Sequence, residues 1–390
     1  MNFDLQRARR ETPGCANVLH FNNAGAALMP EPVLDALIDH LQLEAQIGGY
    51  EAAERASDLL DHAYEAAAQL LGCAPEEIAF VENATRAWDM AFYSLPLGPN
   101  DRILTATSEY ASNYIAFLQA ARRTGASVEA IPNDEHGQIS IEALRNAIDE
   151  RVRLISITHV PTNGGLVNPA AEVGRVAREA GIPYLLDACQ SAGQMPIDVD
   201  VINCDMLSAT GRKYLRGPRG TGFLYVRRSL IESLEPPFLD LHAAEWVARD
   251  RYEVRPDARR FENWETNYAG KIALGVAIDY ALGWGLDAIK ERVTSLAATL
   301  RERLRDLPRV AVHDLGVERC GIVTFTVDGK EPEMIRRSLA EQRINVSVSG
   351  RSSTLLDMQA RGLAALVRAS VHYYNSQEEI ERFCTALKTV

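Results

Sequence analysis

The sequence predicts an α/β protein in which a large domain with a mostly parallel sheet between helices is followed by a small α+β domain. The first observation is that short apolar runs alternate with helical segments through most of the 390 residues. Such alternation is typical of a parallel sheet with helices on both faces. The second is that the pattern changes after residue 285, where a long polar helix leads into a smaller unit. At about 100–200 residues per domain, the length fits two domains.

Each strand of the large domain is predicted from a short apolar run. These runs occupy residues 78–81, 102–106, 127–131, 153–158, 182–186 and 204–208. A long helix is predicted over 51–71, with Gly72 as a favourable residue just past its end. Further helices are predicted over 111–123 and from Asn168-Pro169 onward, where an N-cap residue precedes a proline. Ligands of such sheets bind beyond the carboxyl ends of the strands, so a site is expected in those loops.

The small domain is predicted over residues 286–390. Its elements are a helix at 286–307, a strand at 321–327, a helix at 331–342, a strand at 366–373 and a last helix from residue 376. Ser376 and Glu379 match the capping box of this last helix. We assign residues 21–285 to the large domain and expect the N-terminal segment 1–20 to join the small domain or the cleft between the two.

Composition argues against several classes of protein. The formal net charge of −12 and the pI of about 5.3 argue against nucleic acid or an anionic membrane as partner, since both reward a basic surface. The six cysteines are scattered without metal-ligand spacing, so neither a metal site nor a disulfide framework is expected. No apolar run approaches the roughly 18 residues of a membrane span. The N-terminus has no apolar signal-peptide core, and we expect a cytoplasmic protein.

Two loops after predicted strands carry the candidate chemistry. In the first, Asp187 follows the strand at 182–186; taken alone, it is typical of a turn or a helix cap. The second loop, residues 208–226, places Lys213 among three arginines and several glycines. Taken alone, it is equally typical of a basic surface hairpin.

Taken together, the two loops indicate a cofactor that forms an imine with a lysine. The lysine must be neutral to attack an aldehyde, and neighbouring cations such as Arg212 lower its pKa. Glycine-rich backbone and cationic donors beside Lys213 suit a phosphate group. A pyridinium nitrogen needs a carboxylate partner. Asp187 could supply it, with about 1.5–3 kcal/mol from a charge-assisted hydrogen bond.

Short motifs along the chain strengthen this interpretation. D-A-C-Q at 187–190, T-G-R-K at 210–213 and G-P-R-G-T-G at 217–222 occur in order, with further motifs at 21–25, 83–87, 108–113, 162–165, 260–266 and 367–370. With them the sequence resembles the aminotransferase class V family of pyridoxal 5′-phosphate (PLP) enzymes over nearly the whole chain. By pattern it is most similar to cysteine desulfurases and to cysteine-conjugate C–S lyases, including the ergothioneine type. The resemblance implies PLP as cofactor and the PLP-dependent transferase fold type I.

The resemblance also implies a cofactor site. Lys213 would bind the cofactor covalently and later move protons, and Asp187 would bind the pyridine nitrogen. Gln190 and Asn163 would lie near the phenolic oxygen. The remaining contacts that it implies are ring stacking by Tyr110 and phosphate contacts by Thr85, Arg86, Thr210, Arg212 and, from a neighbouring subunit, Thr266. That last contact implies a homodimer with a shared active site. From the residues alone, Thr85 is equally an N-cap.

For the substrate, the resemblance implies that Arg368 pairs with the α-carboxylate, which a guanidinium binds bidentately. The other members of the implied substrate-binding set are Asn23, Asn163 and Ser349. From the residues alone, a solvent-facing arginine in an alternating strand stays the preferred alternative for Arg368. Two further segments, 48–54 and 263–269, are candidates either for substrate specificity or for structural packing.

Departures from the family pattern bear on the reaction. Tyr110 and Arg212 replace histidines that are usual in the desulfurases. Tyrosine still stacks on a ring but is no acid–base group near neutral pH. Residues 346–366, where the desulfurases carry the cysteine that takes the sulfur, contain serines and no cysteine. Cys189 is expected to be a buried small residue rather than a substitute for it.

These departures favour a C–S lyase. Lys213 would abstract the α-proton of a cysteine-derived amino acid, and the products would be pyruvate and ammonia. An aminotransferase and an amino-acid epimerase share the first step and stay open as alternatives, while a cysteine desulfurase with a non-standard thiol ranks below them. A catalytically silent PLP-binding relative is disfavoured by the set of Lys213, Asp187 and Gln190.

Overall fold

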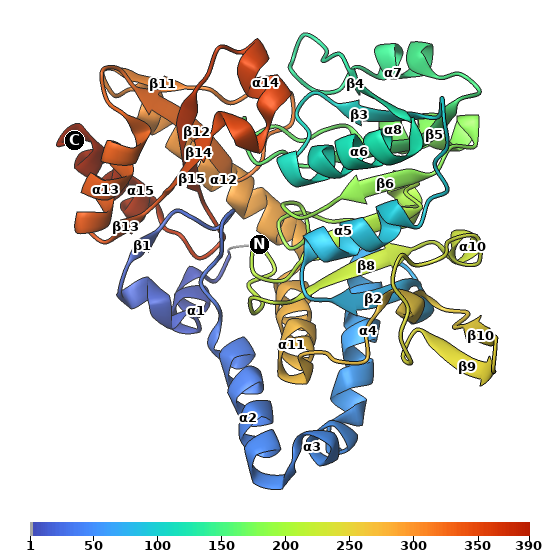
Figure 1. The fold of residues 1–390 in the computed structure, drawn as a ribbon. Coiled ribbons are helices and arrows are strands. Elements are labelled where there is room, and N and C mark those ends of the chain that lie inside the picture. The colour runs from blue at the N-terminus through green and yellow to red at the C-terminus, as the bar shows by residue number, and fades with distance from the viewer. Residues whose placement is uncertain (1–2) are drawn as a thin grey trace.

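A computed structural model describes residues 3–390 and confirms the predicted α/β fold (Figure 1). Its centre is a seven-stranded sheet with the strand order β2-β8-β7-β6-β5-β3-β4. The pairs from β7 to β4 are all parallel, as the alternation of strands and helices predicts. The strands are β2 (Ile78–Val81), β3 (Arg102–Ala106), β4 (Ser127–Ile131), β5 (Val152–Thr158), β6 (Tyr184–Asp187), β7 (Met206–Thr210) and β8 (Gly222–Val226).

The strand β8 corrects the prediction of a single loop over residues 208–226. Only residues 211–221 form a loop, and residues 222–226 form a fully buried strand that pairs antiparallel with both β2 and β7. The run GFLYV explains this difference, because it is apolar and rich in strand-favouring residues, whereas the basic residues all precede it. The loop with Lys213 therefore starts at the carboxyl end of β7 and returns directly into the sheet.

Apolar side chains pack on both faces of this sheet. Along β6, Leu185 belongs to a core cluster with Trp88 and Phe117, and the next residue, Leu186, belongs to the larger core cluster. Successive residues of a strand point to opposite faces, so helices must cover both. The helices of this part are α2 (Glu31–Ile47), α3 (Gly49–Arg55), α4 (Ser57–Leu71), α5 (Ala84–Tyr93), α6 (Ala111–Thr124), α7 (Ile141–Ala147), α8 (Ala170–Ala180), α9 (Val199–Ile202), α10 (Arg228–Ile231) and α11 (Tyr268–Trp284).

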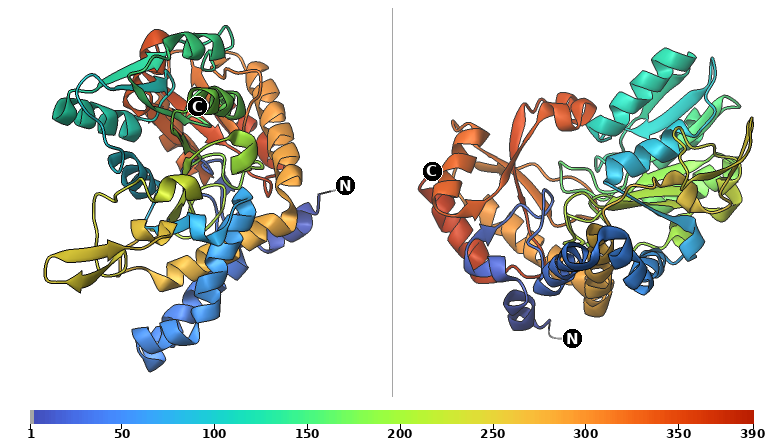
Figure 2. Two further views of the ribbon diagram at one scale, coloured as in Figure 1. Left: turned by 90° about the vertical axis from the view of Figure 1, so that its right-hand side faces the viewer. Right: turned by 60° about the horizontal axis from the view of Figure 1, so that its bottom comes forward.

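The predicted helix over residues 51–71 is wrong in its continuity. It is divided at Ala56 into α3 and α4, and no proline or glycine marks that break in the sequence. Gly72, at φ 71°, ends α4 as predicted. Figures 1 and 2 show α2 and α3 projecting from the body of the molecule as an arm, with α4 leading back to it and α11 packed against α2 and α4.

The predicted start of α8 also needs correction. The helix begins at Ala170 with Pro169 at its N-cap, one residue later than predicted. The side chain of Asn168 is used elsewhere, because its Nδ2 donates to the carbonyl of Thr158 (2.8 Å) and its Oδ1 accepts from the N–H of Ile139 (3.2 Å). Asn168 thus joins two loops instead of capping the helix.

The C-terminal part is a four-stranded antiparallel sheet with helices packed on it, in the order β11-β12-β15-β14. Ser376 and Glu379 form the predicted capping box of its last helix. The predicted strand at 366–373 ends earlier, at Ser370. The elements are α12 (Leu286–Arg305), β11 (Val310–Val312), β12 (Ile322–Val327), α13 (Pro332–Glu341), β13 (Ile344–Asn345), β14 (Ser347–Gly350), α14 (Leu355–Ala360), β15 (Ala365–Ser370) and α15 (Gln377–Lys388).

The N-terminal segment lies against the C-terminal part. It holds α1 (Leu5–Arg10) and β1 (Leu19–His20), and β1 pairs parallel with β13. Met1 and Asn2, the first residues of the predicted segment 1–20, lie outside the described residues. The division of the chain at residue 285 stays a prediction.

A hairpin of β9 (Ala244–Ala248) and β10 (Arg251–Val254) projects from the side of the large sheet (Figures 1 and 2). Within residues 3–390, no single helix is both long and apolar enough to cross a membrane, and α11 and α12 meet that test only as a pair bent by 78°. No group of three His, Cys, Asp or Glu side chains that could hold a metal ion occurs in the described part of the chain.

Candidate active site

Asp187 is the last residue of β6, at the carboxyl ends of the parallel strands. Its neighbours in the sheet are Thr158 of β5 and Ser208 of β7. The residue is only 5% exposed. One carboxylate oxygen accepts a hydrogen bond from the backbone N–H of Cys189 (2.9 Å), and the other accepts one from Nδ2 of Asn113 (3.0 Å). The carboxylate is therefore held on both sides in a fixed orientation.

Lys213 lies in the loop that follows β7, the strand next to β6. Burial lowers the pKa of its ammonium; Cys189 and the carboxylate of Asp187 raise it, and the charges of Arg212 and Arg368 lower it further. The sequence predicts this effect from neighbouring cations alone, whereas burial is its first cause in the structure. Asp187 ends β6, and the loop of Lys213 starts at the end of the neighbouring strand β7, so the two predicted residues lie at the same edge of the sheet.

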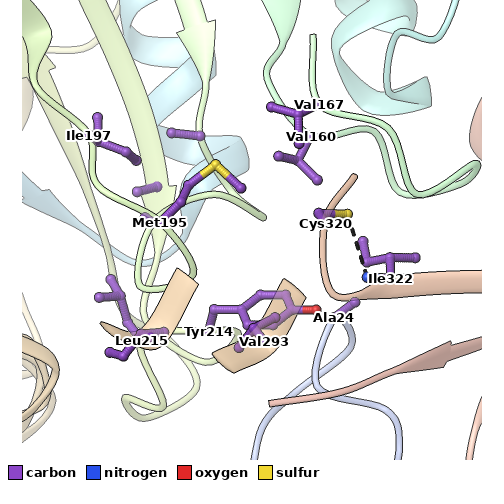
Figure 3. Packing of buried hydrophobic residues seen from close by; sticks show 14 of the residues in the cluster. Ala24, Val160, Val167, Met195, Ile197, Tyr214, Leu215, Val293, Cys320 and Ile322 are labelled. Atoms are coloured by element: carbon purple, nitrogen blue, oxygen red, sulfur yellow. Dashed lines mark hydrogen bonds between the residues drawn. The ribbon is translucent and has the colours of Figure 1, made fainter. Parts of the chain in front are cut away.

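The residues that follow Lys213 anchor the loop in the core. Tyr214 and Leu215 belong to one buried cluster with Val293 of α12 and Ile322 of β12 (Figure 3). The loop is thus packed between the large sheet and the C-terminal part, so the backbone that carries Lys213 is held in place.

Arg216 completes this anchor and contradicts the alternative of a basic surface hairpin. It is 1% exposed and adopts a left-handed backbone conformation with φ 62°. Its guanidinium donates to the carbonyl of Leu28 (2.8 Å), the hydroxyl of Tyr373 (2.6 Å) and the hydroxyl of Thr12 (2.6 Å). The loop is therefore joined both to the N-terminal segment and to the chain that follows β15.

Three buried side chains of the site have polar atoms without a partner. Oε1 of Gln190, Oδ1 of Asn163 and Nε of Arg368 have no hydrogen-bond partner within residues 3–390. The opposite ends of the two amides are fixed, since Gln190 donates to the carbonyl of Ala24 (3.1 Å) and Asn163 donates to the hydroxyl of Thr354 (2.9 Å). A buried polar atom left unpaired costs roughly 1–3 kcal/mol. These atoms fit the cofactor and amino-acid groups that the sequence predicts here.

Arg368 is not the solvent-facing arginine that the alternation of β15 also allows. It is 7% exposed, and its Nη1 donates to the hydroxyl of Thr162. Burial lowers the pKa of its guanidinium, and no carboxylate within residues 3–390 forms an ion pair with it. A buried guanidinium without a counter-charge is costly unless a ligand supplies an anion.

The first turn of α5 carries two of the predicted phosphate contacts. Asn83 caps this helix, with its Oδ1 accepting from the N–H of Arg86 (2.9 Å). The alternative that Thr85 is the N-cap is therefore wrong. Thr85 is exposed on the first turn, where free N–H groups and the helix dipole favour an anion. The guanidinium of Arg86 lies 4.7 Å from the ring centroid of Phe238.

The other predicted cofactor contacts surround Lys213. The hydroxyl of Thr210 donates to the carbonyl of Thr221 (3.3 Å), which closes the loop between β7 and β8. Arg212 donates to the carbonyl of Gly25, and burial lowers the pKa of its guanidinium, with the nearby Tyr110 raising it in part. Tyr110 precedes α6 and is 37% exposed.

Asn23 has structural contacts that the sequence does not predict. It is fully buried, its Nδ2 donates to the carbonyl of Ser370 (2.7 Å), and its Oδ1 accepts from the hydroxyl of Tyr374. Both ends of its amide thus help to fasten the N-terminal segment to β15, and its contact with a substrate stays a prediction. Ser349 is buried on β14, opposite Leu366 of β15.

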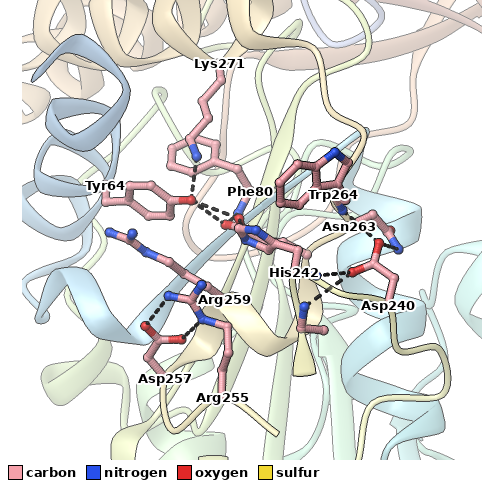
Figure 4. A network of polar contacts seen from close by, with 12 residues as sticks. Tyr64, Phe80, Asp240, His242, Arg255, Asp257, Arg259, Asn263, Trp264 and Lys271 are labelled. Atoms are coloured by element: carbon pink, nitrogen blue, oxygen red, sulfur yellow. Dashed lines mark hydrogen bonds and ion pairs between the residues drawn. The ribbon is translucent and has the colours of Figure 1, made fainter. Parts of the chain in front are cut away.

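A buried network that the sequence did not predict holds the segment with Thr266 (Figure 4). The carboxylate of Glu262 accepts from the hydroxyl of Tyr64 (2.8 Å), the N–H of Phe80 (2.7 Å) and Nε2 of His242 (3.1 Å). Lys271 donates to the same hydroxyl of Tyr64, and burial lowers its pKa to about 8. Apart from the contact of His242, which spans 20 positions, these contacts join residues 182–207 positions apart, which no local pattern reveals.

The two predicted specificity segments meet at one surface pocket. Tyr50 of the first segment and Trp264, Thr266 and Tyr268 of the second line it. Lys213 is not among its lining residues. The pocket is therefore separate from the site around Lys213 within one chain.

Comparison with known proteins gives one consistent family. The family model described as Aminotransferase class-V matches residues 19–383. A probable cysteine desulfurase of Methanothermobacter thermautotrophicus is 29% identical, over 98% of this chain and 97% of that protein. The apo structure of a cysteine desulfurase from Thermococcus onnurineus NA1 is similar at a TM-score of 0.93 and 28% identity, covering 100% of this chain and 98% of that one. A C-DES mutant with glycine covalently linked to its PLP cofactor is similar at a TM-score of 0.88 and 25% identity, covering 97% and 98%.

Proposed function

The chain belongs to the aminotransferase class-V family, and we propose that, among these cysteine desulfurase-like enzymes, its reaction is that of a C–S lyase. The cofactor is pyridoxal 5′-phosphate. The substrate is cysteine or a cysteine conjugate. The bond between the β-carbon and sulfur breaks, the sulfur leaves as hydrogen sulfide from cysteine or as a thiol from a conjugate, and addition of water to the remaining fragment gives pyruvate and ammonia.

The observation that carries this proposal is the absence of a suitable thiol near Lys213. Residues 346–366, which form β14, a turn and α14, contain no cysteine. Of the cysteines in the chain, Cys189 acts most strongly on Lys213, and burial raises the pKa of its thiol to about 12. A thiolate is the form that takes up sulfur, so Cys189 suits desulfuration poorly. A C–S lyase needs no thiolate of its own.

Lys213 acts as the base in the proposed reaction. Its lowered pKa favours the neutral amine, which is the form that accepts the α-proton of the substrate. When bound, PLP supplies an electron sink for the pair released at the α-carbon. Asp187 holds the proton of the pyridine nitrogen, and the contacts from Cys189 and Asn113 keep its carboxylate oriented for that task.

The remaining side chains of the site bind and orient. Arg368 pairs with the α-carboxylate through its unpartnered Nε edge, and Ser349 lies beside the substrate. Gln190 and Asn163 lie near the phenolic oxygen; the free end of each amide is a carbonyl oxygen, so a protonated phenol can donate to one of them, and Tyr110 stacks on the ring. The proposed phosphate contacts are Thr85, Arg86, Thr210 and Arg212.

We also propose that the protein is a homodimer in which Thr266 of each chain contacts the PLP phosphate bound by the other chain. We propose the cytoplasm as its location. The homodimer is supported by the position of Thr266, which lines a surface pocket that does not include Lys213 of its own chain. Mixing a Thr266→Ala chain with a Lys213→Ala chain tests the shared site. Restored activity in the mixture requires that each chain completes the site of the other, and no restoration would reject the arrangement.

Product analysis tests the reaction. The purified PLP-loaded protein, given cysteine or an S-conjugate, should release pyruvate, and the Lys213→Ala variant should not. Transfer of the amino group to a keto acid without pyruvate would support the aminotransferase, and loss of optical activity without cleavage would support the epimerase. If the substrate stays intact, the result would support the catalytically silent PLP-binding relative.

A further inference from the structure

Glu109 is a second buried carboxylate, and it lies close to Asp187. It is 3% exposed and precedes α6. Its Oε1 accepts from the N–H of Tyr110 (2.8 Å), Nδ2 of Asn113 (2.9 Å) and the hydroxyl of Thr158 (2.5 Å). Its Oε2 accepts from the N–H of Thr158 (3.0 Å) and the hydroxyl of Thr105 (3.0 Å). Contacts from β3, β5 and the start of α6 therefore fix this side chain.

One amide connects the two carboxylates. Nδ2 of Asn113 donates to Oε1 of Glu109 (2.9 Å) and to Oδ2 of Asp187 (3.0 Å). The two oxygens are therefore at most about 5.9 Å apart, since both contact the same nitrogen. An NH2 group has two hydrogens, and here each one serves a different carboxylate.

The orientation of the Asn113 amide depends on Glu109. Oε1 of Glu109 already accepts from the N–H of Tyr110 and the hydroxyl of Thr158, so it requires the NH2 end of the amide on its side. The same NH2 end then faces Asp187. If the amide turned by half a rotation, its carbonyl oxygen would face two carboxylates, which is unfavourable in a buried site. Glu109 thus determines that Asp187 meets a donor.

We propose that Glu109 is a positioning residue that acts through Asn113 to hold Asp187 in the orientation required by the pyridine nitrogen of PLP. This inference rests on the cofactor role proposed above for Asp187. Glu109 itself contacts neither substrate nor cofactor in this arrangement. The titratable groups that face it are Asp187 and, from β6, the phenol of Tyr184.

The test measures the affinity of the apo-protein for PLP by titration, with the thermal midpoint of the apo-protein as a separate reading. Glu109→Gln should weaken PLP binding about ten-fold, in line with the loss of one charge-assisted contact, and should shift the absorbance of the bound cofactor. Asn113→Ala should weaken binding to a similar extent while leaving Glu109 in place, so it serves if Glu109→Gln fails to fold.

A matched control is Glu379→Gln, which removes another buried glutamate that lies in α15 and bonds to Arg9 and Asn375. It should lower the thermal midpoint and leave PLP affinity unchanged. If Glu109→Gln behaves in the same way, the role of Glu109 is only structural and the proposal is wrong.

A double variant separates this inference from its premise. In an Asp187→Ala background, Glu109→Gln should weaken PLP binding no further, because the residue acts through Asp187. A further ten-fold loss would overturn the proposed route. If Asp187→Ala alone leaves PLP affinity unchanged, the premise fails instead, and pyruvate formation is measured independently of either result.

Discussion

Replacing Arg368 by lysine tests the proposed grip on the substrate α-carboxylate. Nη1 of Arg368 is occupied by Thr162, whereas Nε has no partner, so the Nε edge of the guanidinium is available for a carboxylate in a two-point contact. Lysine keeps the positive charge beside Lys213 but offers a single point charge. The change therefore removes one charge-assisted hydrogen bond and little else.

The loss follows from the value of that bond. A hydrogen bond to a charged group contributes about 1.5–3 kcal/mol, which corresponds to a drop in kcat/KM of about 10- to 100-fold. We expect this drop for Arg368→Lys with a cysteine S-conjugate. The surface replacement Arg303→Lys on α12, where the arginine is exposed and pairs with Glu381, should leave kcat/KM unchanged.

The methyl ester of the same conjugate provides the decisive comparison, because it lacks the negative charge of the carboxylate. The wild-type protein should use the ester less well than the acid, and Arg368→Lys should cause no further loss with the ester. Equal losses with acid and ester would refute the contact, since the arginine would then act on folding or on the cofactor.

Three further predictions follow from the buried charges. Burial raises the pKa of the Glu109 carboxyl to about 7 from its usual 4.5, so the folded apo-protein holds a proton that the unfolded chain has lost. Stability should then fall by about 2 kcal/mol as the pH rises from about 5 to 7, and urea unfolding should show no such fall in Glu109→Gln. Cys189→Ala should keep pyruvate release from cysteine at the wild-type rate within about two-fold, whereas an assay showing complete loss would point to a thiol-dependent reaction. Arg301→Met leaves the carboxylate of Asp314, whose side chain is 0% exposed, without its ion pair of 2.6 Å; urea unfolding should show a loss of about 3–5 kcal/mol, and an unchanged stability would contradict this.

Local patterns in the sequence were sufficient for most of the sheet. The strands β2 to β7 are short apolar runs, and their burial follows from that alone. β8 is not predicted because its apolar run directly follows a loop rich in charge and glycine, and no break separates the two. The break at Ala56 is not predicted because no proline or glycine marks it, and the following Ser57 and Asp58 disfavour a helix interior only weakly.

The centre of the candidate site was predictable for a different reason. Parallel strands bring their carboxyl ends to one edge of the sheet, so Asp187 after β6 and the loop of Lys213 after β7 must lie close together. The surrounding contacts were not predictable in this way. Glu109 meets Asp187 only through Asn113, and the partners of Arg216 lie about 160–200 residues away in the chain. Such contacts depend on the tertiary fold and leave no periodic trace.

The most direct test of the proposed reaction is the identity of the carbon and sulfur products formed from cysteine by the PLP-loaded protein. Elimination at the β-carbon predicts pyruvate, ammonia and sulfide in equal amounts, with no alanine. Alanine in place of pyruvate, with the sulfur retained on Cys189 or another cysteine of the protein, would contradict the C–S lyase and identify a desulfurase that uses a thiol at an unusual position.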